Sequence, residues 1–320
     1  PLDAFVLNSR MAKAINDSFK LALAQLNPVV GDIDGNVERA RAARARAAQG
    51  GADLVAFTEL YLTGYPIEDL ALKPALQKAA REACESLARE TNDGGPAMLM
   101  GLPWGEAPFV YNAAALLDRG RIETVRYKYN LPNYGVFDEK RVFAPGPLPR
   151  PIPFRGVKLG VPVCEDIWSR EVCEALARDG AELLIVPNGS PYWMDKQRTR
   201  YEVARARVSE THLPLAYLNQ LGGQDELVFD GGSFVLNADG AVAGQLPAWE
   251  EALGVTDWRK EAGRWRCLPG EIAGIEEGDA ANYLACVLGL RDYVEKNGFP
   301  GVVLGLSGGV DSALCAAMDV

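Results

Sequence analysis

The sequence contains a single histidine, His212, and none of its six cysteines stands in a Cys-x-x-Cys pair. A zinc site with the usual cysteine and histidine spacing is therefore not expected, and the lone histidine, at the end of a helical pattern, is expected to cap or pack. No apolar run approaches the roughly 18 residues that cross a membrane, and the apolar run 4–7 is too short for a signal peptide. We therefore expect a cytoplasmic protein with no membrane partner, and residues 1–18 as a leader.

Positive charge is also scarce, because acidic residues outnumber basic ones and the formal net charge is -10. Binding to nucleic acid generally requires a basic surface that neutralises phosphates, so no nucleic-acid partner is expected. The basic run 39–46 mixes arginine with alanine and is better explained as the solvated face of a helix. With 320 residues, 48% of them hydrophobic, the chain can bury the core of one large domain or two ordinary ones.

Apolar strand patterns alternate with amphipathic helix patterns along the chain, which predicts an α/β fold. Helices are expected at 36–49, with Asn36 as the N-cap, and at 74–91, 170–178, 196–210 and 280–297. Strands are expected at 19–26, 53–58, 97–101, 112–118, 121–127, 157–163, 183–187, 215–219, 232–236, 241–243 and 301–306. The stretch 251–279 is irregular and acidic, which indicates a linker.

Three of the expected strands end on side chains that can carry chemistry: Glu59, Lys128 and Cys164. A thiolate is a nucleophile, a nearby ammonium favours the thiolate and can stabilise an oxyanion, and a carboxylate can shuttle the proton. Free cysteines are more often small buried hydrophobes, so the thiol on its own leaves both roles open.

The flanks of these three residues resemble the nitrilase superfamily. Glu59 stands in Thr-Glu-Leu, Lys128 in Arg-Tyr-Lys-Tyr-Asn-Leu-Pro-Asn-Tyr-Gly-Val-Phe-Asp-Glu, and Cys164 in Val-Cys-Glu-Asp-Ile-Trp. The resemblance spans residues 21–249 and implies a four-layer α-β-β-α sandwich that hydrolyses a carbon–nitrogen bond through a thioester. It implies that Cys164 attacks, that Glu59 is the base and that Lys128 holds the oxyanion. Glu139 either matches a second carboxylate found in many members or is a surface charge, and both interpretations stay open.

A second resemblance lies near the end of the sequence, where Gly-Leu-Ser-Gly-Gly-Val-Asp-Ser looks like the pyrophosphate loop of ATP pyrophosphatases. A Ser/Gly loop between a strand and a helix N-terminus offers backbone N–H groups to an anion. The loop lacks the lysine of GxxxxGK[ST], so ordinary NTPase chemistry is not implied, and a plain glycine turn is the weaker alternative. The resemblance implies ATP binding by Ser307, Gly308, Gly309, Val310, Asp311 and Ser312.

Both pieces occur in this order in the family of glutamine-dependent NAD(+) synthetases. Segments 131–137 and 188–192, followed by Lys196 and Arg200, resemble its glutaminase half; residue 189 is glycine where the family more often has alanine, a departure expected to have little consequence. The resemblance implies that L-glutamine is hydrolysed to glutamate and ammonia. The ammonia would attack adenylated deamido-NAD in a synthetase half that consumes ATP with Mg²⁺. No cofactor or metal is implied for the glutaminase half, and a homo-oligomer is implied for the whole.

The same resemblance implies a glutamine-binding set in which Lys196 meets the substrate α-carboxylate and Tyr134 and Glu165 meet its amino group. The complete set is Tyr134, Glu165, Trp168, Ser190 and Lys196.

The implied domains are a leader 1–18, a glutaminase domain 19–250, a linker 251–279 and the start of the synthetase domain at 280–320. This last part would supply the first helix, strand and loop of a Rossmann-like fold, and we expect it to be too short to make NAD. The alternative is a stand-alone nitrilase-family amidase or carbamoylase, against which the ATP loop argues. A non-catalytic scaffold with an idle Cys164 is a third possibility, and the three strand-end residues argue against it.

Overall fold

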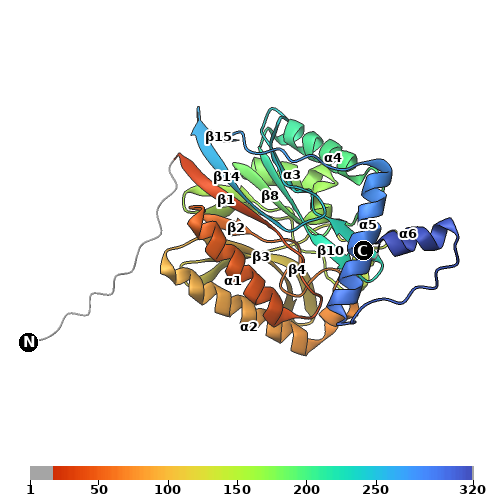
Figure 1. Ribbon diagram of the computed structural model, residues 1–320. Helices are drawn as coiled ribbons and strands as arrows, with labels where there is room; N and C mark the ends of the chain where they lie inside the picture. Colours follow the sequence, from red (N-terminus) through yellow and green to blue (C-terminus); the bar gives the residue numbers. More distant parts are fainter. Residues whose placement is uncertain (1–16, 319–320) are drawn as a thin grey trace, which may run out of the picture.

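The structure, a computed structural model, describes residues 17–318. The leader expected at residues 1–18 lies outside the described residues except for its last two, and Ser18 already begins the first strand. Figure 1 shows two sheets packed face to face with helices on their outer faces.

Seven strands form the first sheet, in the order β15-β14-β1-β2-β3-β4-β5. β1, β2 and β3 run parallel, and the strands added on both sides run antiparallel. The bounds are β1 (Ser18–Gln25), β2 (Leu54–Ala56), β3 (Ala97–Glu106), β4 (Phe109–Asp118), β5 (Arg121–Tyr127), β14 (Ala252–Glu261) and β15 (Arg264–Cys267).

Six strands form the second sheet, in the order β13-β12-β9-β8-β7-β6, with β7, β8 and β9 parallel. The bounds are β6 (Ile152–Phe154), β7 (Val157–Gly160), β8 (Leu183–Asn188), β9 (Leu215–Asn219), β12 (Phe234–Leu236) and β13 (Val242–Gln245). A separate hairpin joins β10 (Leu221–Gln224) to β11 (Leu227–Asp230).

The helices lie outside the two sheets. α1 (Ile33–Gln49) and α2 (Pro74–Glu90) cover the first sheet, and α3 (Arg170–Arg178) and α4 (Lys196–Thr211) cover the second. α5 (Gly278–Lys296) and α6 (Val310–Met318) follow at the C-terminal side. Short 3₁₀ turns are η1 (Glu68–Leu72), η2 (Thr91–Asp93), η3 (Glu139–Arg141) and η4 (Cys164–Ile167).

Side-chain alternation along the strands builds these layers. In β1, Leu21 and Leu23 face the second sheet, whereas Ala22 and Ala24 face the helices. β8 behaves in the same way, because Leu183 and Ile185 join the core between the sheets while Leu184 and Val186 pack against α3 and α4. Period-two alternation thus gives each sheet two apolar faces, and the predicted four-layer α-β-β-α sandwich is confirmed.

The first helix begins earlier than predicted. Its N-cap is Asp32, whose Oδ1 accepts a hydrogen bond from the Gly35 N–H at 3.0 Å. Asn36 is buried inside the helix, where its side chain accepts from Val29 N at 2.9 Å and donates to Val29 O at 2.8 Å. The predicted N-cap was therefore wrong: this asparagine satisfies the backbone of the loop before the helix, not the helix terminus.

The linker predicted at 251–279 was also wrong over most of its length, because β14 and β15 occupy residues 252–267 of it. β14 pairs with β1 along the whole of that strand. The alternation of apolar and polar residues in β14 is weak, because Gly254, Thr256 and Asp257 interrupt it. Trp258 is nevertheless fully buried and stacks on Phe19 with ring centroids 5.9 Å apart. The first packed domain therefore extends beyond the predicted residue 250.

The strand predicted at 301–306 is absent from the described structure. Residues 301–306 are exposed, and no strand among residues 17–318 lies beside them to supply hydrogen bonds. An apolar β-branched sequence forms a strand only when a neighbour pairs with it. The preceding helix α5 and the following helix α6 do form where they were predicted.

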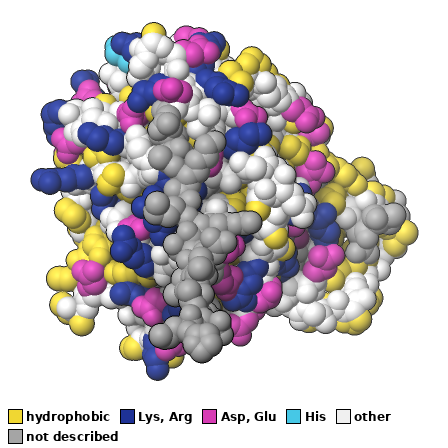
Figure 2. Space-filling view, turned by 90° about the vertical axis from the view of Figure 1, so that its left-hand side faces the viewer, with side chains coloured by type: hydrophobic (Ala, Val, Ile, Leu, Met, Phe, Trp, Pro, Cys, Tyr) yellow, Lys and Arg dark blue, Asp and Glu magenta, His cyan; other side chains and the backbone are white. Residues whose placement is uncertain are grey.

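Surface charge and helix hydropathy agree with the composition. On the face shown in Figure 2, basic and acidic side chains lie side by side outside the grey atoms, without a broad patch of one sign. Within residues 17–318 no helix combines the length and the apolar character needed to cross a bilayer.

Replacing Trp258 by alanine is expected to lower the free energy of unfolding by about 3–5 kcal/mol, because it empties a large site in the core between the two sheets. The measurement is urea unfolding followed by far-UV circular dichroism. Arg259→Ala, at the exposed neighbouring position of the same strand, is the matched control and should stay within about 0.5 kcal/mol of the parent. Equal effects of the two substitutions would contradict an integral β14.

Candidate active site

The three strand-end residues of the sequence analysis are buried close together. Glu59 follows β2, Lys128 follows β5 directly, and Cys164 follows β7, so the first sheet supplies the two charged groups and the second sheet the thiol. Lys128 Nζ donates to Glu59 Oε1 at 2.6 Å, and both residues influence the pKa of Cys164. The structure therefore brings together residues that are more than a hundred positions apart in sequence.

Lys128 lies between two carboxylates. Its ammonium is 2.6 Å from Glu59 Oε1 and 2.9 Å from Glu139 Oε1, and its side chain is fully buried. Burial alone would lower the pKa of Lys128, but Glu139 and Glu59 together raise it well above its ordinary value. Lys128 is therefore a permanently charged group at neutral pH, suited to stabilise a developing oxyanion.

Glu59 is held by three donors. Oε1 accepts from Lys128 and, at 2.8 Å, from the Asn112 side chain, while Oε2 accepts from the Gly189 backbone N–H at 2.9 Å. The sequence analysis missed Asn112, although a polar residue at a buried position of the apolar strand β4 is a signal that could have revealed it. These contacts fix the carboxylate orientation that a general base requires.

Gly189 matters more than expected. A methyl group on its Cα would lie 2.7 Å from Cδ1 of the Tyr65 ring and 3.3 Å from Glu59 Oε2. Tyr65 thus occupies the space of the missing side chain, and alanine at residue 189 would force this ring to move. The expectation that the glycine has little consequence was wrong for the packing of this site.

Cys164 sits four residues beyond the end of its strand, not on it as predicted. β7 ends at Gly160, and Cys164 opens the 3₁₀ turn η4 with a φ of +45°, a conformation unfavourable for a non-glycine residue. Asp166 fixes this turn, because its carboxylate accepts from the N–H groups of Val163, Tyr129 and Asn130 at 3.0, 3.1 and 2.7 Å. Asp166 therefore ties the cysteine turn to the chain that follows Lys128.

The thiol of Cys164 is protonated in the resting site. Burial raises its pKa well above the ordinary value and Glu59 adds to the rise, whereas Lys128 opposes it. The predicted stabilisation of a thiolate by the ammonium is thus outweighed. A neutral thiol needs a neighbouring base before it can act as a nucleophile.

Glu139 is buried beside the triad and is not a surface charge. Its Oε1 accepts from Lys128 and, at 3.0 Å, from the Tyr65 hydroxyl. Burial raises its pKa to about 7, although Lys128 opposes the rise. Its Oε2 is buried without a hydrogen-bond partner among residues 17–318, which is unusual for a carboxylate and leaves one acceptor for a bound molecule. Sequence reasoning also missed Tyr65, which follows no local pattern.

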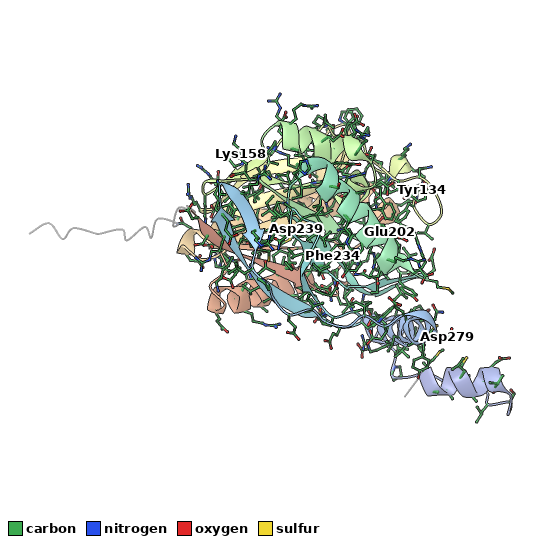
Figure 3. The ribbon with its side chains drawn as sticks, turned by 90° about the horizontal axis from the view of Figure 1, so that it is seen from above. Tyr134, Lys158, Glu202, Phe234, Asp239 and Asp279 are labelled. Atoms are coloured by element: carbon green, nitrogen blue, oxygen red, sulfur yellow. The ribbon has the colours of Figure 1, made fainter. Side chains whose placement is uncertain are left out.

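An open cleft of about 900 Å³ adjoins η4, and three of the predicted glutamine-binding residues line it: Tyr134, Glu165 and Trp168. The Tyr134 hydroxyl donates to Glu165 Oε2 at 2.9 Å, and burial raises the pKa of Glu165. Tyr134 is exposed and lies at the edge of the molecule in Figure 3. Tyr134 and Glu165, which were predicted to meet the same substrate group, therefore contact each other, and their role in glutamine binding stays a prediction.

Lys196, at the start of α4, lies between two tryptophan rings. Its Nζ is 4.4 Å from the ring centroid of Trp168 and 2.9 Å from that of Trp193, and only 3% of the residue is exposed. No carboxylate among the described residues is within ion-pair distance of it. Burial and then Arg200 lower its pKa to about 7. Sequence reasoning missed Trp193, which supplies one of the two rings.

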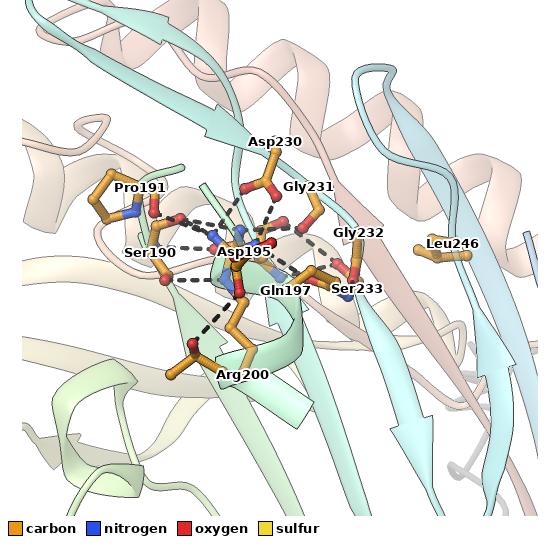
Figure 4. Close-up of polar contacts among 12 residues, drawn as sticks. Ser190, Pro191, Asp195, Gln197, Arg200, Asp230, Gly231, Gly232, Ser233 and Leu246 are labelled. Carbon is orange, nitrogen blue, oxygen red and sulfur yellow. Dashed lines mark hydrogen bonds and ion pairs between the residues drawn. The ribbon is translucent and has the colours of Figure 1, made fainter. Parts of the chain in front are cut away.

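Ser190 and Arg200 belong to a buried network that shapes the loop 188–192 (Figure 4). The Arg200 guanidinium bonds both oxygens of Asp230 at 2.7 and 2.8 Å and donates to Ser190 O at 2.7 Å. Asn219 Oδ1 accepts from Ser190 N at 3.0 Å. Arg200 is thus engaged with protein groups, and it positions the loop that carries Gly189.

The predicted ATP-binding residues lie apart from this cluster, in the segment after α5. Ser307 Oγ and Ser312 Oγ are 3.0 Å apart, the Gly309 N–H donates to Ser307 Oγ at 3.4 Å, and α6 begins at Val310. The loop and helix N-terminus predicted for this motif therefore form. Among residues 17–318 no group of three or more His, Cys, Asp or Glu side chains could hold a metal ion.

Replacing Lys128 by methionine is expected to lower the free energy of unfolding at pH 8 by about 3–5 kcal/mol, because Glu59 and Glu139 would remain buried without their cation. Adding Glu139→Gln should recover part of the loss, since it removes one of the two charges. Chemical denaturation of the single and double variants measures this. A loss below about 1 kcal/mol would show that Lys128 does not balance the charges of Glu59 and Glu139.

Comparison with known proteins gives two family matches. The model of the carbon-nitrogen hydrolase family matches residues 20–266, and that of NAD synthase matches residues 283–320. A glutamine-dependent NAD(+) synthetase from Rhodobacter capsulatus is 50% identical over 304 residues, covering 95% of this chain and 55% of the relative. The chain spans about half the length of the curated relatives it matches.

Solved structures of similar proteins match the fold of this chain. A glutamine-dependent NAD+ synthetase from Acinetobacter baumannii in complex with adenosine diphosphate superposes with a TM-score of 0.89 at 40% identity, covering 95% of this chain and 57% of that one. An amidase from Nesterenkonia sp. superposes with a TM-score of 0.68 at 32% identity, covering 77% of this chain and 92% of that one. With a family match over most of its length and an amidase matched almost completely, the chain belongs to the carbon-nitrogen hydrolase family.

Proposed function

We propose that this chain is the glutamine-hydrolysing part of a glutamine-dependent NAD(+) synthetase and releases ammonia from L-glutamine. The observation that carries the proposal is the buried Lys196 ammonium, which has two aromatic faces around it but no carboxylate from residues 17–318 within ion-pair distance. A buried cation without a partner is costly, and a substrate carboxylate would supply the missing charge. Glu165 and Tyr134 offer acceptors for an α-ammonium group.

The charges of the site thus match an amino acid amide. Glutamine carries a carboxylate for Lys196, an ammonium for Glu165 and a side-chain carboxamide that can reach Cys164. A simple aliphatic amide would use only the last of these, leaving Lys196 unpaired. This favours glutamine over the alternative substrate of a stand-alone amidase.

The reaction would proceed in two halves. Cys164 Sγ attacks the carboxamide carbon while Glu59 takes the thiol proton, and the carbonyl oxygen becomes an oxyanion beside Lys128. Glu59 then gives this proton to the amide nitrogen, the carbon–nitrogen bond breaks, and ammonia leaves a thioester. Water attacks the thioester, its proton passes through Glu59 to the departing sulfur, and glutamate is released.

Glu139 would orient the carboxamide in the first half, before ammonia leaves. Its unpartnered Oε2 can accept an N–H of the substrate amide, while its Oε1 stays with Lys128 and Tyr65. With these contacts, the amide nitrogen would lie near the carboxylates and the carbonyl oxygen near the ammonium. Glu139 therefore acts as a positioning group and has no covalent role.

The segment after α5 would begin the synthetase half. The pyrophosphate of ATP would be held by Ser307, Gly308, Gly309, Val310, Asp311 and Ser312. ATP would adenylate deamido-NAD and release this pyrophosphate, and ammonia would then displace AMP to give NAD. Mg²⁺ would neutralise the phosphates in the synthetase half, but residues 17–318 contain no acidic cluster that could hold it. A homo-oligomer and a cytoplasmic location remain predictions; the free cysteines of the described chain suit a reducing compartment.

Ammonia release from L-glutamine is the direct test. Parent protein should release ammonia from glutamine in preference to asparagine and to propionamide, and Cys164→Ala should abolish the release by at least about a thousandfold because no other group can form the acyl intermediate. The reaction is followed with a coupled glutamate dehydrogenase assay.

Cys173→Ala is the matched control, since it removes another buried free thiol outside the site and should keep activity once folded. Preference for propionamide over glutamine would replace the proposal by the stand-alone amidase. Equal activity of Cys164→Ala and the parent would exclude the thioester mechanism.

The pH dependence provides an independent check on Lys196. Its pKa of about 7 means that it is charged below pH 7 and neutral above, so kcat/KM for glutamine, divided by kcat/KM for propionamide, should fall by up to roughly tenfold per unit above pH 7. Groups such as Glu139 act on both substrates, so their contribution to the pH dependence cancels in this ratio. In Lys196→Arg, which keeps its charge, the ratio should stay flat between pH 6 and 8.5. A flat ratio in the parent would refute the carboxylate subsite.

A further inference from the structure

Helix α5 packs directly on the β10–β11 hairpin of the hydrolase module, although most of this helix falls in the NAD synthase match. Its buried side is a stripe of Ala281, Ala285, Leu288 and Asp292. Figure 1 shows α5 lying beside β10, and Figures 1 and 3 show α6 at the side of α5, away from the two sheets. The helix is therefore part of the packed structure around the hydrolase module.

Polar contacts fix the position of α5 at its C-terminal end. The buried Asp292 carboxylate accepts from Asn27 Nδ2 at 2.6 Å and from Gly223 N at 2.7 Å. Lys296 Nζ lies 3.6 Å from Asp292 and donates to Gly223 O at 2.8 Å. A Cβ on Gly223 would lie 2.9 Å from the Gly289 Cα, so the helix and hairpin backbones approach as closely as two glycines allow.

The hairpin is continuous with the loop that completes the hydrolase site. Tyr192 N donates to Val228 O of β11 at 2.7 Å, and Asp230 at the end of β11 binds Arg200, which in turn holds Ser190 O. Gly189, two residues before Pro191 in the same loop, donates its N–H to Glu59. Displacement of this loop would therefore change the hydrogen bonds of the proposed general base.

Tyr192 connects the same loop to α5. Its hydroxyl donates to Asn282 Oδ1 at 2.8 Å, and its ring meets Trp249 edge-on at a centroid distance of 5.1 Å. Only two residues, Ser190 and Pro191, separate Tyr192 from Gly189. Two hydrogen bonds, one at each end of the segment 189–192, thus connect the first helix of the second module to the Glu59 carboxylate.

We propose that Tyr192 is a positioning residue through which α5 sets the geometry of the hydrolase site: the Tyr192–Asn282 hydrogen bond holds the loop 189–192 so that the Gly189 N–H orients Glu59. The position of the second module's first helix then decides how well Glu59 removes the Cys164 proton. The inference rests on the proposed roles of Cys164 and Glu59, but not on glutamine as the substrate.

The test uses the whole chain and two readouts. In Tyr192→Phe and in Asn282→Leu, kcat for glutamine hydrolysis should fall about fivefold, the factor that corresponds to one hydrogen bond of about 1 kcal/mol. The rate of Cys164 alkylation by iodoacetamide, identified by peptide mass spectrometry, should fall by the same factor because it needs the same proton transfer and no glutamine. The double variant should lose no more than either single variant.

Two further variants separate positioning from general stability. Asn282→Asp keeps an acceptor for the Tyr192 hydroxyl and should stay within twofold of the parent in both readouts. Tyr283→Phe removes a hydroxyl on the same helix that bonds Ala317 O instead of the hydrolase module, and it should change neither readout. Circular dichroism melting verifies that each variant is folded, and if one of the pair fails to fold, the other tests the same bond.

The outcomes distinguish this inference from the proposed function. Slower alkylation in Tyr192→Phe and Asn282→Leu, without glutamine hydrolysis by the parent, would support the positioning role and reject glutamine as the substrate. Unchanged alkylation and kcat in both folded variants would overturn the inference. Additive losses in the double variant would also overturn it, because they would show that the two residues act separately.

Discussion

The interaction on which the site depends is the buried ammonium of Lys128 between the carboxylates of Glu59 and Glu139. Burying any one of these three charges without its partners would destabilise the fold, because the charge would lose its hydration without gaining an ion pair. The fold must therefore bring all three together. That requirement joins the end of β2, the end of β5 and the turn η3 at one place. It also keeps the cation charged while leaving the thiol of Cys164 neutral, which divides the chemical roles among neighbouring groups.

Around this centre, charged side chains are used mainly to hold backbone. Asp166 accepts three N–H groups and fixes the turn of Cys164, and Arg200 with Asp230 fixes the loop that contains Gly189. Loops at the end of a sandwich have backbone groups that no strand satisfies, and buried polar side chains can satisfy them. Lys196 is the exception among the buried charges of the site, since its surroundings are aromatic and leave room for an anion from outside.

The division of the chain into modules follows packing more closely than family matches. β14 and β15 complete the first sheet although their sequence suggested a linker, and α5 packs on the hydrolase hairpin although it lies largely in the synthetase match. The residues between β15 and α5 therefore form the short connection between the two modules. Helix α5 contacts both the hydrolase hairpin and α6. Such an arrangement gives the second module a physical means of influencing the first, through side chains that are few and identifiable.

The sequence by itself determined the sandwich class, most helices and the trio Glu59, Lys128 and Cys164 with its acidic and aromatic flanks, because alternation and motif are local properties of the chain. It could not place Asn112, Tyr65 or Trp193 in the site, since each is defined by partners distant in sequence, as when Gly189 meets Glu59. It suggested a strand at 301–306 that has no pairing neighbour among the described residues, and it overlooked β14, whose partner β1 lies more than two hundred residues away. Which side chains share a buried site, and which apolar segments pair, was decided only by tertiary structure, because burial and hydrogen bonding act between segments that the linear pattern does not connect.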